Sequence, residues 1–220
     1  MRPISSVALL AFAAACEPGP DVIRTGVLWM DWPSQVVASN TFPVRLVVQR
    51  PCALVEAFKP DARADESAVT FTPYFLGDPH GGGCVALQTV DLSVGPANLD
   101  TTSLAPGLAG DFARTYEMRG ATGWSDAWVE RTFGDVAVYS QVPLPTAPVR
   151  NAGGRVLMQV DTLGCVRIRP GGLYGPGTAM VLENPTDTVG LSGAFVRGYI
   201  HYPAAPVCGE AQVFHLVSRN

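Results

Sequence analysis

Five cysteines and three histidines are the residues of this chain whose types suggest chemistry most directly. The cysteines are Cys16, Cys52, Cys84, Cys165 and Cys208, and the histidines are His80, His201 and His215. Thiols form disulfides, and thiols and imidazoles bind zinc. The chain has no Cys-x-x-Cys pair and its histidines lie at no ligand spacing, so the pattern favours disulfides over a metal. We therefore expect no metal site and no cofactor.

An apolar segment precedes the first cysteine. Arg2 is followed by a predominantly apolar run from Ile4 to Ala15. The run is shorter than the roughly 20 residues that a membrane-spanning helix needs, but it suits the apolar region of a signal peptide. We expect residues 1–15 to be a signal peptide and the rest of the chain to be exported.

The end of this run, Ala13-Ala14-Ala15-Cys16, resembles the lipobox of bacterial lipoproteins. The resemblance implies that Cys16 carries lipid and that residues 16–21 are the lipidated end and a spacer. The implied partner is the membrane. Because Glu17 rather than Asp follows the cysteine, the resemblance favours the outer membrane of the cell envelope. Ordinary secretion, with a free thiol at Cys16, is the alternative.

Cysteine parity agrees with a separate role for Cys16. An exported chain pairs its cysteines, and five is an odd number. If Cys16 is set aside, the remaining four allow three pairings. We expect the nearest-neighbour scheme, Cys52–Cys84 and Cys165–Cys208, which gives one bridge to each half of the chain.

Motifs for catalysis are incomplete. His80-Gly81-Gly82-Gly83 resembles the loop of esterases whose backbone N–H groups stabilise an oxyanion. That loop works with a Gly-x-Ser-x-Gly nucleophile turn, which this sequence lacks. We expect no catalytic residue and a non-enzymatic protein.

Aromatic and polar side chains supply only weak binding candidates. They are Trp32, Trp124, Trp128, His201 and Tyr202. Trp32 lies in Asp31-Trp32-Pro33 and is expected to be exposed. Trp124 and Trp128 are four residues apart and share a face if residues 125–130 form a helix. Core packing is the alternative for the tryptophans, and a structural role is the alternative for His201.

The composition indicates how such residues are positioned. The chain of 220 residues has 23 glycines and 19 prolines, and only 15% of its residues are charged against 47% hydrophobic. This argues against a helical bundle and against disorder, and favours a loop-rich, all-β protein. The net charge is −4 and shows no basic stripe, so nucleic acid is not an expected partner.

Strand-like runs separated by turn residues support an all-β fold. They cover residues 22–30, 42–49, 53–58, 68–76, 84–92, 112–118 and 136–142, and then five segments after residue 153. The Pro- and Gly-rich stretch 143–154 is the predicted linker between two domains. Pro73 predicts an edge strand or a bulge within 68–76.

The two halves resemble known domains. An alternating strand at 42–49 after a polar turn, and Leu104-Ala-Pro-Gly107 before a later strand, resemble Ig-like β-sandwiches of bacterial surface proteins, here residues 22–142. In residues 155–220, Gly164-Cys165, Leu182-Glu-Asn184, Val196-Arg-Gly-Tyr199 and Cys208 resemble a small OB-like β-barrel of bacterial envelope proteins. Five short strands suffice for such a barrel.

These observations predict a membrane-anchored envelope lipoprotein that serves as a non-enzymatic binding or assembly module. Its partner is expected to be another envelope protein or a glycan. One alternative is an envelope hydrolase or carbohydrate-active enzyme that uses paired carboxylates. Another is a secreted structural component of a surface assembly.

Overall fold

The structure is a computed structural model that describes residues 21–38, 40–51, 55–78, 85–95, 112–123, 128–139, 149–171, 179–184 and 188–220. These residues form strands and turns without a helix, which confirms the predicted all-β fold class. In this described part of the chain, no helix has the length and apolar character needed to cross a membrane. The predicted signal peptide, Cys16, Cys52, Cys84 and Trp124 lie outside the described residues.

The strands follow one another closely along the chain. They are β1 (Asp21–Arg24), β2 (Val27–Pro33), β3 (Gln35–Val37), β4 (Phe42–Pro51), β5 (Val55–Lys59), β6 (Ala62–Ala64), β7 (Ala68–Phe71), β8 (Tyr74–Gly77), β9 (Val85–Val94), β10 (Phe112–Thr122), β11 (Val129–Tyr139), β12 (Arg150–Val160), β13 (Val166–Pro170), β14 (Met180–Leu182), β15 (Phe195–His201) and β16 (Val213–Arg219).

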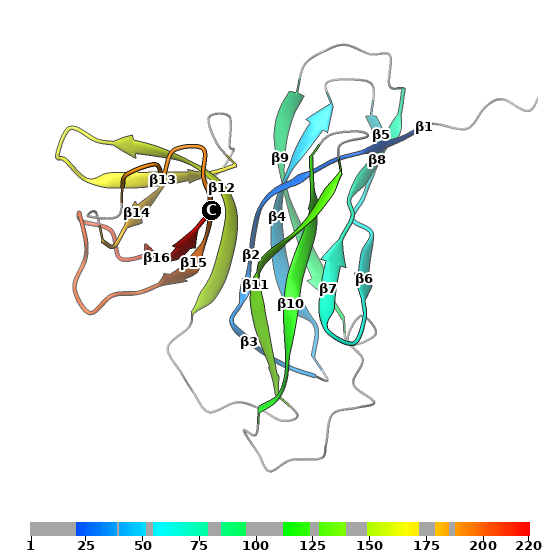
Figure 1. Ribbon diagram of the computed structural model, residues 1–220, viewed down its shortest axis with the longest axis horizontal. Helices are drawn as coiled ribbons and strands as arrows, with labels where there is room; N and C mark the ends of the chain where they lie inside the picture. The colour runs from blue at the N-terminus through cyan, green and yellow to red at the C-terminus, as the bar shows by residue number, and fades with distance from the viewer. Residues whose placement is uncertain are drawn as a thin grey trace, which may run out of the picture.

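The first part of the chain packs sheets against each other. A five-stranded sheet has the order β3-β11-β10-β7-β6, and a three-stranded sheet has the order β1-β8-β5. Strands β2, β4 and β9 belong to a third sheet. Alternate side chains of β4, such as Val44 and Leu46, share a core with Phe71, Tyr116 and Phe133 of the five-stranded sheet. These layers stand side by side in Figure 1.

The last part of the chain closes into a barrel of five strands. Its strands pair in the order β12-β13-β14-β16-β15, and β15 pairs with β12 again. Its core contains Val156, Ile168, Leu182, Ile200 and Phe214. The closed barrel fits the OB-like domain predicted from the sequence.

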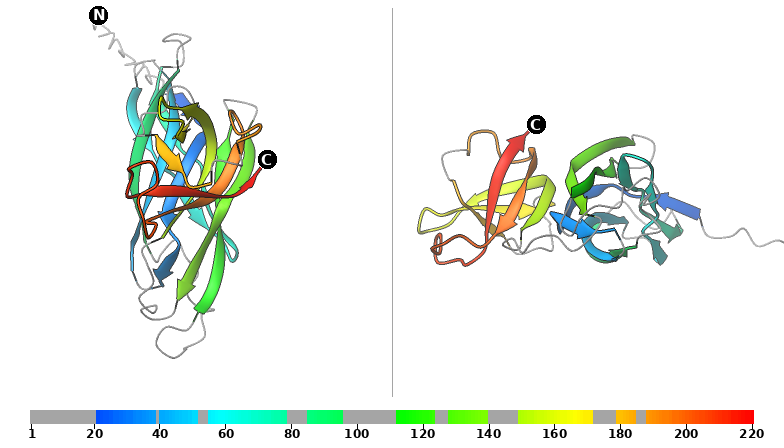
Figure 2. Two further views of the ribbon diagram at one scale, coloured as in Figure 1. Left: turned by 90° about the vertical axis from the view of Figure 1, so that its left-hand side faces the viewer. Right: turned by 90° about the horizontal axis from the view of Figure 1, so that it is seen from below.

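Strand β12 joins the two parts. Its first residues, from Arg150 to Gly154, pair with β2, and its later residues pair with β13. The eight-stranded sheet therefore runs from β9 through β2 and β12 into the barrel. We call the packed sheets of the first part, strands β1 to β11, the sandwich. In Figure 2 the barrel and the sandwich lie side by side along this sheet. Gly153 and Gly154, expected in the linker, lie within a strand.

A disulfide braces the barrel. Cys165 and Cys208 are bonded across a sequence separation of 43 residues, as predicted. Cys165 directly precedes β13, and Cys208 lies in the turn that leads towards β16. The bridge therefore ties the first hairpin of the barrel to the segment before its last strand.

Several predicted strands have different bounds. The segment 68–76 is split at Pro73 into β7 and β8, which belong to different sheets. A proline cannot donate a ladder hydrogen bond, and its carbonyl instead accepts the N–H of Thr25 at 3.1 Å. Strand β11 begins at Val129, seven residues before the predicted start at 136. The predicted helix over 125–130 is therefore wrong for residues 129 and 130, which belong to this strand.

Candidate functional site

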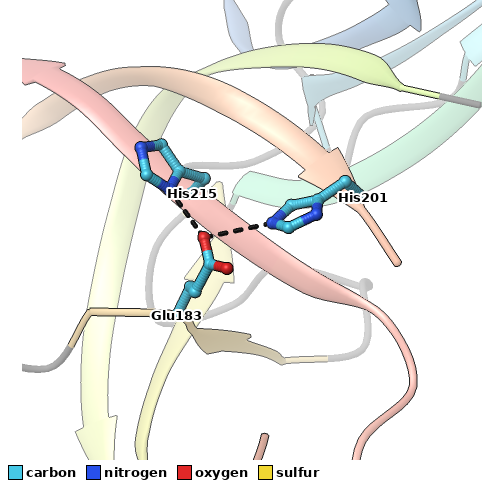
Figure 3. A group of neighbouring side chains, drawn as sticks. All are labelled: Glu183, His201 and His215. Atoms are coloured by element: carbon cyan, nitrogen blue, oxygen red, sulfur yellow. Dashed lines mark hydrogen bonds and ion pairs between the residues drawn. The ribbon is translucent and has the colours of Figure 1, made fainter. Parts of the chain in front are cut away.

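Three side chains that could act as metal ligands meet on one face of the barrel. Glu183 follows β14, His201 ends β15 and His215 is the third residue of β16. In the sheet, β16 lies between β14 and β15, so the three residues come from adjacent positions. Figure 3 shows both imidazoles directed towards one oxygen of the Glu183 carboxylate. We call this group the Glu183 cluster.

Strand alternation explains why these side chains share a face. Their chain neighbours Leu182, Ile200 and Phe214 are buried in the barrel core. Successive side chains of a strand point to opposite faces. Glu183, His201 and His215 therefore project to the outside of the barrel, where their side chains are 29%, 19% and 39% exposed.

The distances within the cluster are those of hydrogen bonds. Glu183 Oε2 lies 2.6 Å from His215 Nδ1 and 3.1 Å from His201 Nε2. Each imidazole donates to the carboxylate when that nitrogen carries the proton. One carboxylate oxygen thus holds two rings that are 14 residues apart in the chain.

The imidazoles also change the acidity of the carboxyl group. The hydrogen bond from His215 lowers the pKa of Glu183 below its usual range, and the bond from His201 acts in the same direction. Partial burial opposes them by penalising the charge. The carboxylate is therefore ionised at neutral pH and is available as an acceptor or as a ligand.

Tyr199 supports both imidazole rings. Its ring stacks on His215 with centroids 4.7 Å apart and an interplanar angle of 16°. It also contacts His201, at a centroid distance of 5.3 Å. Tyr199 is the cross-strand partner of His215, so the sheet itself fixes this contact.

The cluster combines donor atoms that suit a transition metal. One ligand atom from each residue lies within 4.8 Å of the other two. Imidazole nitrogen and carboxylate oxygen are ligands of zinc and related ions, and three protein ligands leave positions open for water. Without an ion, the same groups form a hydrogen-bonded network.

The tryptophan candidates have different environments. Trp32 was expected to be exposed, and this is wrong: its side chain is fully buried. Its indole N–H donates to the Asp135 carbonyl at 3.0 Å, which satisfies the one polar atom of the ring. A fully buried ring offers no face to an external ligand.

Trp128 lies beside a groove instead. The groove has a volume of about 600 Å³ and is also lined by Tyr74, Arg24 and Glu130. The Arg24 guanidinium carbon lies 5.0 Å from the centre of the Trp128 ring, within cation–π range. Trp128 directly precedes β11, and the expected helix face that it would share with Trp124 lies outside the described residues.

The other polar candidates lie at the barrel. His201 belongs to the Glu183 cluster. Tyr202, which directly follows it, is 59% exposed. Glu183 was not among the binding candidates expected from the sequence, and it entered only through the Leu182-Glu-Asn184 motif of the barrel. The three ligand residues are separated by 18 and 14 positions, which is no metal-binding spacing. Only the order of strands in the barrel brings them together.

No protein-family model, curated protein or solved structure matches this chain significantly.

Proposed function

We propose that this protein is an exported envelope lipoprotein, anchored through lipid on Cys16, whose folded part is a non-enzymatic binding or assembly module. The proposal includes an Ig-like type for the sandwich and an outer-membrane location. The observation that carries it is the Cys165–Cys208 disulfide together with the Ala-Ala-Ala-Cys16 motif.

Disulfides persist in oxidising compartments, so the barrel cystine supports export. The remaining pair has indirect support. Pro51 at the end of β4 and Val85 at the start of β9 are cross-strand partners; Cys52 directly follows Pro51, and Cys84 directly precedes Val85. A Cys52–Cys84 bridge would leave Cys16 as the one unpaired thiol.

The role of a binding module rather than an enzyme rests on how acidic groups are used. In the groove beside Trp128, Asp61 accepts from the Thr72 hydroxyl at 2.8 Å, and Glu130 pairs with Arg119 at 3.2 Å. Asp65 accepts the backbone N–H of Ser67 at 2.7 Å. These three carboxylates are engaged in contacts within the chain, which favours a binding surface over a pair of acids that attack a glycosidic bond.

The anchor is tested by expressing the full chain and a Cys16→Ser variant in a bacterial host. We expect the parent chain in the membrane fraction, with the mass of a diacylglyceryl group on an N-terminal Cys16 peptide. Each buried acyl methylene adds about 0.8 kcal/mol, so two or more chains give durable attachment. Cys16→Ser should lose the lipid mass and the processing that depends on it.

Ser5→Ala is the matched control, because it leaves the small residues before Cys16 and the thiol unchanged. It should fractionate like the parent chain. An unmodified Cys16 in the membrane-free fraction would instead favour the secreted alternative. Peptide mapping without reductant should also link Cys52 to Cys84, and a Cys16-containing disulfide would contradict the scheme.

A further inference from the structure

We propose that Glu183, His201 and His215 form a binding site for one divalent transition-metal ion of the zinc class on the outer face of the barrel. The three ligand atoms lie within 4.8 Å of one another and come from three neighbouring strand ends. This inference rests on the barrel alone and stands whether or not Cys16 carries lipid.

The observed separations are close to those around a zinc ion. Zinc lies about 2.0–2.1 Å from nitrogen or oxygen ligands, so two ligands of a tetrahedral site are roughly 3.3 Å apart. Glu183 Oε2 is 2.6 Å from one imidazole nitrogen and 3.1 Å from the other. The two imidazole nitrogens lie within 4.8 Å of each other, so an ion that replaces the N–H protons would bind as the two rings turn towards it.

The rings are held in place before an ion arrives. Strands β15 and β16 are paired through the register Tyr199↔His215 and His201↔Val213. Tyr199 stacks on His215 and also contacts His201, which limits rotation of both rings. Ligands fixed by a closed barrel and a packed aromatic ring lose little entropy on binding.

The charge at the cluster also favours a cation. In the seven other ion pairs between described residues, an arginine with a permanent positive charge faces the carboxylate. The Glu183 cluster differs from them. The described partners of the Glu183 carboxylate are the two imidazoles, which are neutral when each acts as a metal ligand. A divalent ion therefore meets one negative charge and no fixed positive charge among these partners.

The donor set selects the class of ion. Imidazole nitrogens suit zinc, copper, nickel and iron, whereas calcium and magnesium require mostly oxygen ligands. The side chains are 19% to 39% exposed, so a hydrated ion reaches them and water completes its coordination. Two histidines and one carboxylate leave at least one position open for a ligand from outside.

The test is calorimetric titration of the full chain, purified in detergent and freed of metal with a chelator, with Zn²⁺ near neutral pH. We expect one zinc per chain by calorimetry and by elemental analysis after dialysis. Co²⁺ in place of zinc should give visible absorption bands of a bound, distorted ion.

Four variants locate the site. His201→Gln, His215→Gln and Glu183→Gln should each weaken zinc binding by more than the roughly 10–100-fold that loss of a supporting partner costs. His80→Gln removes the remaining histidine of the chain and should bind like the parent. An intact Cys165–Cys208 disulfide and an unchanged thermal midpoint of the metal-free protein confirm folding of each variant.

Two outcomes would overturn the proposal. One is a parent chain that retains no zinc, in which case the cluster is a structural hydrogen-bond network. The other is zinc binding that all three cluster variants leave unchanged, which would assign the ion to another part of the chain.

Discussion

Asp161 shows how a single carboxylate organises the turn before the barrel disulfide. Its Oδ1 accepts the backbone N–H of Leu163 at 2.9 Å and that of Cys165 at 3.0 Å. Its Oδ2 accepts from Arg167 at 3.1 Å. The N–H of Cys165 contributes most to lowering the pKa of Asp161 below its usual range, and Arg167 adds to the effect.

We expect Asp161→Asn to destabilise the protein at neutral pH and to matter less in acid. A carboxyl group whose pKa is lowered by folding contributes stability above its unfolded pKa of about 3.9. That contribution is lost as the pH falls through the lower pKa of the folded state. Urea unfolding of both proteins from pH 7 down to the acid limit of folding measures the gap.

Asp91→Asn is the matched control for this pH dependence, because the Asp91 carboxylate pairs with the exposed Arg45 side chain. It should change the free energy of unfolding little at any pH. A gap between Asp161→Asn and the parent that stays constant from neutral to acid pH would contradict this role for Asp161.

At the scale of elements, β12 depends on glycines where it crosses β2. Gly154 has a φ of +140°, and a Cβ there would lie 2.6 Å from the Trp29 Cα and closer still to the Leu28 carbonyl oxygen. At Gly153, a Cβ would lie 2.5 Å from the Phe133 carbonyl oxygen. These glycines let β12 approach the sandwich closely enough to continue its sheet.

We therefore expect Gly154→Ala to lower the free energy of unfolding by about 3 kcal/mol, from overpacking against backbone and from an unfavourable φ. Gly95→Ala is the matched control, because its Cβ would meet Thr41 Cγ2 at an ordinary 3.7 Å. Urea unfolding measures both. Equal losses for the two variants would show that the β12–β2 approach does not depend on Gly154.

The sequence predicted most strands, because alternation and turn residues are local signals. Val44, Leu46 and Val48 alternate in the sequence and are buried together in β4. The partners of each strand were less predictable. From the sequence alone, Gly153 and Gly154 indicate a flexible linker. The close backbone of β2 and β11 shows why β12 needs residues without a side chain at these positions.

The candidate site was predictable only in part. His201 was identified beside Tyr202, but its contacts arise from the order β14-β16-β15, which spacing along the chain does not reveal. Trp32 was misassigned because a proline neighbour suggested a loop, whereas Asp31-Trp32-Pro33 is the end of β2. Its ring is buried in the core between the sheets and donates to Asp135 of β11, a contact 103 residues away in sequence.

For the whole molecule, the barrel and the sandwich share cores as well as a sheet. Phe195, the first residue of β15, belongs to the sandwich core and contacts Phe133 with ring centroids 4.9 Å apart. Conversely, Trp29 of β2 packs in the barrel core, 5.7 Å from Phe214. Each part therefore buries an aromatic ring that the other supplies.

An ion pair lies at this junction. Asp31 of β2 is 5% exposed and accepts from Arg150 Nε of β12 at 2.9 Å. The two residues line a groove of about 540 Å³ together with Met180 and Ile200 of the barrel. A nearly buried carboxylate is costly without its partner, so the Asp31–Arg150 pair stabilises the contact between β2 and β12.

We expect Arg150→Gln to lower the free energy of unfolding of the whole chain by about 2–4 kcal/mol, because it removes the cation that is hydrogen-bonded to the buried Asp31 carboxylate and leaves only the exposed Arg45 near it. Arg45→Gln is the matched control in the same groove: Arg45 and Asp91 are 54% and 68% exposed, and such a pair contributes about 1 kcal/mol or less. Urea unfolding, followed by tryptophan fluorescence and by circular dichroism, measures both variants. If Arg150→Gln costs no more than Arg45→Gln, the junction does not depend on the buried pair, and the β12–β2 pairing and the shared aromatic cores hold the barrel to the sandwich without it.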